Sequence, residues 1–365
     1  MSAIYIHIPF CVRKCGYCDF FSVPFSADTE DRYIDTLCGS IERESNRDTE
    51  IKTVYIGGGT PALLSEKSFE RIFASLAKFR IGEDAEITSE ANPATVSYEK
   101  LCFMRKYFNR ISIGVQSFSD RELQILGRVH NGEQARKTVL DAKRAGFDNI
   151  SIDLMYSLPF QTEESFSRSL ETACLLPITH ISAYELSIEE NTPFGKNRTY
   201  FQNLIDDDCD FDLCLRKYLK DKGFERYEVS NYAKPDFMSL HNINYWNNGD
   251  YFGFGAGAVG YKKGERYKFI SDIEKYIESG GTCLEFSEKV SRKDRAFENL
   301  MLGLRMIKGF SVNKVTDYLS GDEKKLFYEK IRLMEEYVCL KENYLFCTEK
   351  GLDFLNSVLL NLFCW

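Results

Sequence analysis

The sequence predicts an α/β fold: an open, partial barrel of six strand–helix units, (β/α)6, of the TIM type, followed by a small winged-helix-like α+β domain. Short apolar or β-branched runs recur through the first half of the chain, with longer stretches of helical periodicity between them. Strands that alternate with helices form βαβ units with a parallel sheet. Several runs also end on glycines or polar residues, and in such barrels the chemistry collects where the strands end.

We expect six strands, at residues 4–8, 53–56, 86–89, 110–115, 149–155 and 180–186. Residues 65–79 carry apolar side chains at spacings of three and four, which indicates an amphipathic helix. Six strands instead of eight would leave the barrel open on one side. At 365 residues the chain has room for a barrel and a smaller domain. We expect the barrel at 1–235, a linker at 236–290 and the C-terminal domain at 291–365.

Three of the twelve cysteines, Cys11, Cys15 and Cys18, fall within eight residues after the first run. Closely spaced thiolates hold iron–sulfur clusters, and three protein ligands would leave one iron of a four-iron cluster open to a small molecule. Spacing alone leaves other interpretations. Structural zinc usually takes four protein ligands, a disulfide needs an oxidising compartment and no signal peptide is apparent before the loop, and incidental buried thiols are common.

The other nine cysteines show no paired metal-ligand spacing, and we expect them to be reduced and mostly structural. They are Cys38, Cys102, Cys174, Cys209, Cys214, Cys283, Cys339, Cys347 and Cys364.

Polar groups or glycines also close the next four runs. Gly57-Gly58-Gly59-Thr60-Pro61 follows the second run, where missing side chains let the backbone approach a ligand, although a tight turn would equally explain the glycines. Glu90, Gln116 and Asp153 lie at the ends of the third, fourth and fifth runs. Each alone fits a helix cap or a solvated strand end. Together they predict a polar rim around one axial pocket.

The stretch Ile6-His-Ile-Pro-Phe-Cys-x3-Cys-x-Tyr-Cys-Asp-Phe20 resembles the opening of radical S-adenosylmethionine (SAM) proteins of the oxygen-independent coproporphyrinogen oxidase group, and within it the haem-chaperone branch. The likeness runs from about Ile4 to the C-terminus. It implies that the three cysteines bind a [4Fe-4S] cluster whose open iron takes SAM. The residues that it implies for SAM binding are Tyr5, Gly58, Gly59, Thr60, Glu90, Gln116, Arg128 and Asp153.

Two later segments are compared with the same family. Where relatives usually read Tyr/His-Gly-Leu-Pro-Gly/Asp-Gln, this chain has Tyr156-Ser-Leu-Pro-Phe-Gln161. Ser157 therefore replaces a small flexible residue and Phe160 adds bulk, so we expect a differently shaped loop beside an intact SAM site. Residues 223–233 resemble the family's barrel-closing segment, whose Tyr and Glu side chains either line the substrate side or form an amphipathic edge strand.

A second group is His241-Asn242-Ile-Asn-Tyr245-Trp246, which holds one of only four histidines. Imidazole is a common axial ligand of haem iron, and aromatic rings offer a flat apolar surface to a macrocycle. A lone histidine beside aromatic residues is more often simply packed and hydrogen-bonded. The group matches the His-Asn-x-x-Tyr-Trp motif of the haem-chaperone branch, and this match implies haem contacts from His241, Asn242, Tyr245 and Trp246.

The C-terminal domain is predicted to combine helices with a hairpin. Residues 294–306 and 331–337 carry helical apolar stripes, residues 338–347 form a hairpin that turns at 341–343, and a helix begins at Glu349. We expect a winged-helix-like unit that acts as a lid or docking module and partly covers the barrel mouth. Its mixed charges and the net charge of −8 argue against nucleic acid as a partner.

The resemblance favours a haem chaperone that passes haem to an acceptor protein and carries a [4Fe-4S] cluster with exchangeable SAM. We expect it in the cytoplasm because no apolar run of about 18 residues occurs; a transient contact with a membrane protein is compatible with this. The alternative is oxygen-independent coproporphyrinogen III dehydrogenase. Those enzymes carry a further cysteine where Phe20 stands here, and an N-terminal extension. A radical SAM enzyme for another substrate is a third hypothesis. The acceptor and the oligomeric state do not follow from the sequence.

Overall fold

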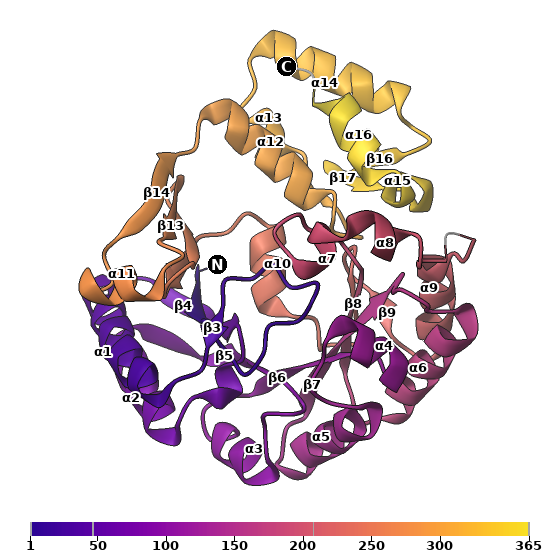
Figure 1. Cartoon of the computed structure of the whole chain (residues 1–365). Coiled ribbons are helices and arrows are strands. Elements are labelled where there is room, and N and C mark those ends of the chain that lie inside the picture. Colours follow the sequence, from indigo (N-terminus) through magenta and orange to yellow (C-terminus); the bar gives the residue numbers. More distant parts are fainter. Residues whose placement is uncertain (1, 46, 207, 364–365) are drawn as a thin grey trace.

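The computed structural model describes residues 2–45, 47–206 and 208–363. Its centre is a run of six parallel strands within one twelve-stranded sheet (Figure 1). Their spatial order is their order in the chain, as expected for successive right-handed βαβ units. The six strands are β1 (Ser2–Ile8), β4 (Glu50–Gly58), β5 (Arg80–Ala91), β6 (Arg110–Gln116), β7 (Asn149–Tyr156) and β8 (His180–Glu185). The predicted open (β/α)6 barrel is therefore confirmed.

The six strands are apolar because the sheet is covered on both faces. Ile6, Ile113 and Ile152 are fully buried, and the register pairs Ile6 with Ile56 and Ile113 with Ile152. β5 begins six residues before the expected start at Glu86, because its first half is polar and largely exposed and carries no apolar alternation.

Helices surround the sheet on its outer side (Figure 1). In the predicted helix at 65–79, Ser65 caps α2 by accepting a hydrogen bond from the Ser68 N–H, and the buried stripe includes Phe69 and Ile72. The outer helices are α1 (Ala27–Glu44), α2 (Glu66–Leu76), α3 (Tyr98–Met104), α5 (Gly132–Arg144), α6 (Glu163–Leu175) and α9 (Phe211–Asp221). Short elements in the connections are β2 (Phe10–Cys11), β3 (Val23–Pro24), the 3-10 turn η1 (Pro61–Leu63), α4 (Asp120–Leu126), α7 (Pro193–Lys196) and α8 (Arg198–Gln202).

Both edges of the six-stranded core are extended, so the expected linker at 236–290 is largely part of the sheet. β11 pairs in parallel with β1, and β12 to β14 continue as an antiparallel meander. At the other edge β10 runs antiparallel to β8 and is followed by β9, which makes 223–233 an edge segment. These elements are β9 (Glu225–Arg226), β10 (Asn231–Ala233), α10 (Leu240–Trp246), β11 (Tyr251–Phe254), β12 (Val259–Lys262), β13 (Glu265–Phe269), α11 (Ile273–Glu278) and β14 (Leu284–Lys289). β14 and β9 are the two ends of the sheet, so the barrel stays open.

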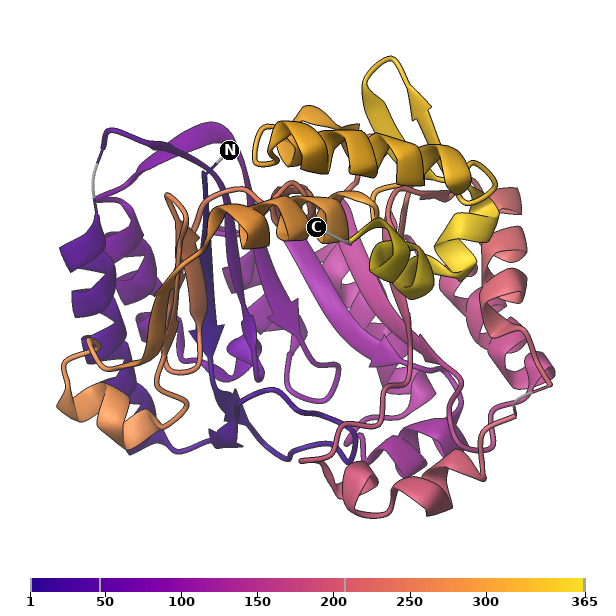
Figure 2. The same ribbon diagram turned by 90° about the horizontal axis from the view of Figure 1, so that it is seen from above.

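The C-terminal unit has its own apolar core, and Figure 2 shows it at the end of the barrel where the six strands begin. The cysteine loop follows the end of β1, at the opposite end, so this unit does not cover the cysteine loop. Its role as a lid or docking module at the open side of the barrel stays a prediction. The unit packs near α10 and bridges both sheet edges: Glu298 pairs with Arg266 of β13 at 2.7 Å, and the Arg305 carbonyl accepts a hydrogen bond from the Val229 N–H at 3.1 Å.

Helices and a hairpin form this unit, as predicted. Glu342 and Asn343 have φ angles of 47° and 70°, the left-handed pair that a tight two-residue hairpin requires. The helix expected at 331–337 begins earlier and ends at Leu333, after which the chain turns into the hairpin. The elements are α12 (Arg292–Gly303), β15 (Phe310–Ser311), α13 (Asn313–Thr316), α14 (Gly321–Leu333), β16 (Val338–Lys341), β17 (Tyr344–Cys347), α15 (Glu349–Asp353) and α16 (Leu355–Leu362).

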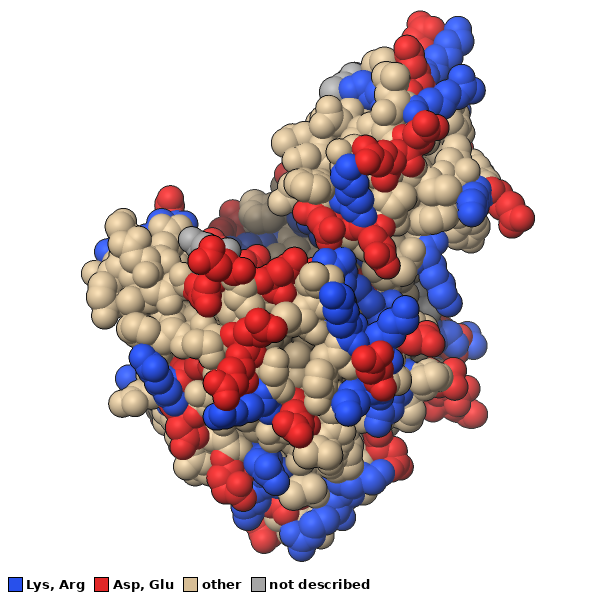
Figure 3. All heavy atoms as spheres, turned by 90° about the vertical axis from the view of Figure 1, so that its right-hand side faces the viewer, with Lys and Arg blue, Asp and Glu red and all other residues tan. Residues whose placement is uncertain are grey.

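Acidic and basic side chains are interspersed over the face drawn in Figure 3. Within the described part of the chain, no helix combines the length and the apolar character needed to cross a bilayer.

Candidate cofactor site

The cysteine loop starts and ends on a two-stranded ladder between β2 and β3, in which Cys11 pairs with Pro24. Gly16, midway along it, donates a backbone hydrogen bond to the Leu126 carbonyl at 3.1 Å and accepts one from the Phe194 N–H at 2.9 Å. A Cβ at Gly16 would lie 2.6 Å from the Phe194 ring, so glycine is required there. The loop is therefore fixed to α4 and α7. The thiols of Cys11, Cys15 and Cys18 are half-buried and free.

Seven of the eight residues predicted to contact SAM lie with the three cysteines around one pocket of about 140 Å³ at the strand ends. They are Gly58, Gly59, Thr60, Glu90, Gln116, Arg128 and Asp153. The strand-end rim expected from the sequence is thus present as a single concave surface.

Arg128 brings positive charge to the thiols. Its Nη1 donates to the Cys15 Sγ at 3.5 Å and its Nη2 donates to the Gly114 carbonyl at 2.6 Å, while its buried Nε has no hydrogen-bond partner among the described residues. Burial raises the pKa of the Cys11 thiol, and raises that of Cys18 to about 11. A metal requires the thiolate form, which the guanidinium favours.

Two half-buried carboxyl groups also line the pocket. Glu90 accepts hydrogen bonds from the Tyr55 hydroxyl at 2.8 Å and from the Gly58 N–H at 3.0 Å, and burial, with the charge of Asp153, raises the pKa of Glu90 to about 7. Asp153 accepts from the Ser112 hydroxyl at 3.2 Å, and burial raises its pKa as well. The pocket therefore offers both a cation and carboxyl groups to a ligand.

The glycines permit close packing of the strand ends on the cysteine loop. Gly58 has a φ of +113°, and a Cβ there would lie 2.5 Å from the His7 ring. A Cβ at Gly59 would lie 2.6 Å from the Phe10 carbonyl oxygen. Both the tight-turn and the close-approach interpretations of the glycine run are therefore compatible with the geometry.

Tyr5 does not line this pocket. Its hydroxyl is hydrogen-bonded to His7 Nδ1 at 2.9 Å and its ring stacks on Tyr55, which separates it from Glu90. Sequence reasoning missed Tyr55, Tyr184 and Ser112, which position Glu90, Gln116 and Asp153 respectively through their hydroxyl groups. The available signal was the alternation of side-chain direction along β4, β6 and β8, because every second residue of a barrel strand points to the axis.

His241 is buried and does not face a cavity. Its Nδ1 is hydrogen-bonded to Thr53 Oγ1 at 2.8 Å and its Nε2 to the Tyr245 hydroxyl at 2.9 Å. Burial and the charge of Arg110 lower its pKa to about 3, so the imidazole is neutral. Both ring nitrogens are therefore engaged by protein side chains, and a contact between this imidazole and haem stays a prediction.

Of the four residues in this motif, Tyr245 alone lines the cavities described here. Asn242 and Trp246 line none of them, and Trp246 lies under the Arg305 guanidinium with its Nε1 buried and unpartnered among the described residues.

A lateral cavity of about 480 Å³ leads from the cysteine loop to Tyr245. It shares Lys14 and Phe20 with the cofactor pocket. Tyr245 and Tyr251 are common to it and to a third cavity of about 680 Å³ beside α12. The three cavities therefore adjoin one another between the cysteine loop and the His241 motif.

Ser157 and Phe160 both adopt left-handed backbone conformations, with φ of 54° and 62°. These are conformations that glycine adopts without strain, so the loop keeps a glycine-type backbone at both substituted positions. The expectation of a differently shaped loop rested on residue bulk alone. Phe160 lies under the Arg121 guanidinium, 4.6 Å from the ring centroid.

Comparisons with known proteins agree with this geometry. Residues 5–173 match the Radical SAM superfamily model and residues 290–354 match the HemN C-terminal domain. The chain is 36% identical to the heme chaperone HemW of Lactococcus lactis subsp. lactis, over 98% of this chain and 96% of that protein. It is 36% identical to HemW of Escherichia coli, over 98% and 97%.

The structure of coproporphyrinogen III oxidase (HemN) from Escherichia coli, described as a radical SAM enzyme, covers 99% of this chain, with 89% of its own length matched, at a TM-score of 0.82. Its sequence identity is 21%, so this likeness concerns the fold alone. The relatives above are similar over almost their whole length. The chain belongs to the HemW family of radical SAM proteins.

Proposed function

We propose that this protein is a haem chaperone, which binds haem and passes it to an acceptor protein while its cysteine loop holds a [4Fe-4S] cluster with SAM as an exchangeable ligand. The observation that carries the proposal is the pair of adjoining cavities between the cysteine loop and Tyr245. Its 480 Å³ lateral part falls in the usual size range of ligand sites. Family membership supports the same conclusion.

The donor set of the pocket fits the cluster and SAM. Cys11, Cys15 and Cys18 would be the cluster ligands, and three thiolates leave one iron open. Bound there, the pair would supply one-electron reductive chemistry. The guanidinium of Arg128 suits a carboxylate, and Glu90 and Asp153 suit an ammonium group and ribose hydroxyls.

The remaining SAM-site residues would shape the pocket. Gly58, Gly59 and Thr60 supply backbone that can approach a ligand closely, and Gln116 is held by the Tyr184 hydroxyl at 2.8 Å. Tyr5 would act through Tyr55, on which its ring stacks.

Haem would occupy the lateral cavity. Tyr5, Phe21 and Tyr251 give it aromatic walls. Lys14 places an ammonium group where a propionate could pair with it, and Lys268 could do so by leaving Glu285, its ion-pair partner at 3.0 Å. A flat macrocycle with acidic side chains matches this combination.

Tyr245 and His241 would act as a pair at the far wall of this cavity. Tyr245 lines the cavity, and its hydroxyl is hydrogen-bonded to His241 Nε2 at 2.9 Å. Rotation of the Tyr245 ring would free His241 Nε2, so the same two side chains can offer iron either a phenol oxygen or an imidazole nitrogen.

Phe20 weighs against the dehydrogenase alternative. It stands where those enzymes carry a further cysteine, and it is 62% exposed at the junction between the cofactor pocket and the lateral cavity. An apolar ring there suits a macrocycle surface.

The deciding experiment assays the anaerobically reconstituted protein in parallel for haem binding and for coproporphyrinogen III oxidation with SAM. We expect about one haem per chain and no decarboxylated product. Efficient product formation with weak haem binding would instead establish the dehydrogenase.

A further inference from the structure

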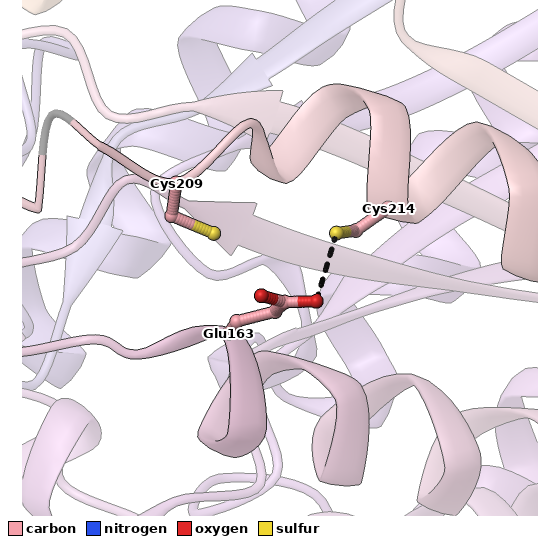
Figure 4. A group of neighbouring side chains, drawn as sticks. All are labelled: Glu163, Cys209 and Cys214. Atoms are coloured by element: carbon pink, nitrogen blue, oxygen red, sulfur yellow. Dashed lines mark hydrogen bonds between the residues drawn. The ribbon is translucent and has the colours of Figure 1, made fainter.

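Glu163, Cys209 and Cys214 form a thiol–carboxylate group outside the cofactor pocket. Glu163 is the first residue of α6, Cys209 precedes α9 and Cys214 lies in its first turns. One ligand atom from each lies within 4.8 Å of the others, and the Cys214 thiol donates to Glu163 Oε1 at 3.7 Å. Figure 4 shows the three side chains converging from separate segments of the chain.

Packing between α6 and α9 fixes the backbone that carries two of these ligands. Phe166 and Phe211 are buried and pack edge to face, with ring centroids 5.6 Å apart. Glu163 lies three residues before Phe166, and Cys214 lies three residues after Phe211. Positions three apart share a helix face, so both ligands project at the edge of this apolar contact.

The donor types and spacing suit a tetrahedral thiophilic cation. Zinc–sulfur bonds of about 2.3 Å and zinc–oxygen bonds of about 2.0–2.2 Å place the donor atoms of a tetrahedral site roughly 3.5–3.8 Å apart. The Cys214 Sγ to Glu163 Oε1 distance of 3.7 Å already meets this spacing. Because all three donors lie within 4.8 Å, small side-chain rotations bring Cys209 into place.

Local charge also favours a dication. Burial, followed by the charges of Cys214, Glu163, Asp206 and Asp210, raises the pKa of Cys209 to about 11. Burial and Glu163 raise the pKa of Cys214 in the same direction. The negative charges that keep these thiols protonated attract a metal ion, which would displace the two protons on binding.

We propose that Glu163, Cys209 and Cys214 bind a thiophilic divalent cation, zinc, with water as the fourth ligand. The site joins α6 to the segment before α9. That segment already holds the loop after β7, since the Leu204 carbonyl accepts a hydrogen bond from the Phe160 N–H at 2.7 Å. Zinc would therefore brace the loop that follows the strand carrying Asp153.

The test uses the full chain, purified without oxygen and with its cluster assembled. Zinc is titrated in competition with a chromophoric chelator, and zinc and iron are counted after gel filtration. We expect one zinc per chain in the wild type, and at least tenfold weaker binding in Cys209→Ala, Cys214→Ala and Glu163→Gln at unchanged iron content. Cys174→Ala is the matched control, because Cys174 lies on α6 with Glu163 but outside the group, and it should bind zinc like the wild type.

Cobalt(II) supplies an independent readout of the ligand set. Difference spectra against Cys214→Ala should show sulfur-to-cobalt charge transfer and the intense visible bands of a tetrahedral ion. The proposal is overturned if wild type retains no zinc, if the three variants bind it as tightly as Cys174→Ala does, or if Cys209 and Cys214 are recovered as a disulfide from the zinc-treated protein.

Discussion

The ring of His241 stacks on that of Tyr55 with centroids 5.0 Å apart, and the Tyr55 hydroxyl donates a hydrogen bond to Glu90. One tyrosine therefore touches both the histidine motif and the cofactor pocket. Thr53 and Gly58 mark these two levels on β4, five residues or roughly 16 Å apart along the strand. Tyr55, on the strand between them, is the side chain that joins the two levels.

The cysteine loop provides the first prediction. Replacing Cys11, Cys15 or Cys18 with Ala should abolish cluster assembly, because each removes one of three thiolates around a single pocket. Cys38→Ala and Cys102→Ala are the controls and should retain the cluster. Iron and sulfide counts on the purified variants measure this, and full iron loading of Cys15→Ala would contradict the ligand assignment.

The second prediction concerns SAM. Adding it to the reduced protein should perturb the electron paramagnetic resonance signal of the cluster, since a ligand at one iron alters its electronic environment. The perturbation should require at least tenfold more SAM in Arg128→Ala and Asp153→Ala, which remove the cation and one carboxyl group of the pocket. A wild-type spectrum that saturating SAM leaves unchanged would contradict the site.

The third prediction distinguishes the roles of His241 and Tyr245 in haem ligation. His241→Ala should change the haem absorption spectrum and weaken haem retention, with the iron–sulfur content unchanged. Tyr245→Phe removes the hydroxyl that engages His241 Nε2 and should shift the spectrum towards imidazole ligation. Identical haem spectra and affinities for wild type and His241→Ala would rule out a role of the histidine in ligation.

The raised pKa of Glu90 predicts a pH dependence of stability in the cluster-free protein. Its folded pKa is about 7, against an ordinary value of 4.5. Between these values the folded state binds more protons than the unfolded state, so the free energy of unfolding falls as pH rises, by up to about 3 kcal/mol. Urea denaturation should show that the free energy of unfolding falls less between pH 5 and pH 8 for Glu90→Gln than for wild type. An equal fall in the two proteins would contradict the assignment.

The left-handed conformation at Phe160 predicts that Gly is more stabilising than Ala at this position, the reverse of their order inside a helix. Phe160→Gly should be more stable than Phe160→Ala by about 1 kcal/mol, because glycine relieves the strain at φ 62°. Leu140, in the interior of α5, is the control: there Ala should be more stable than Gly by about 1 kcal/mol. Thermal or denaturant unfolding of the four variants gives the comparison.

Much of the fold was predictable because strands buried in a parallel sheet consist mainly of consecutive apolar residues. The six strands and the C-terminal hairpin follow from periodicity and turn residues. β11 was not expected as a strand because Tyr251-Phe-Gly-Phe254 is short and glycine-rich, and its pairing with β1 links segments about 250 residues apart in the chain. Nothing local encodes such a contact.

The site was predictable to the extent that strand ends converge. Glu90, Gln116 and Asp153 meet in one pocket because parallel strands end at the same edge. Cys209 and Cys214 showed no metal spacing in the sequence, because their third partner, Glu163, lies 46 residues before Cys209 on another helix. The hydrogen bonds of His241 to Thr53 and Tyr245 could not be predicted for a related reason, because they depend on tertiary packing.

Because the sheet edges are unpaired, the two ends of the barrel are held together in different ways. The C-terminal unit ties both edges together where the strands begin, through Arg266 with Glu298 and through Val229 with Arg305. At the cysteine end no strand pairing between β14 and β9 opposes their separation in the described chain. The two sides of the barrel are therefore held from outside the strand ladder, by the C-terminal unit at one end and by the hydrogen bonds of Gly16 to Leu126 and Phe194 at the other.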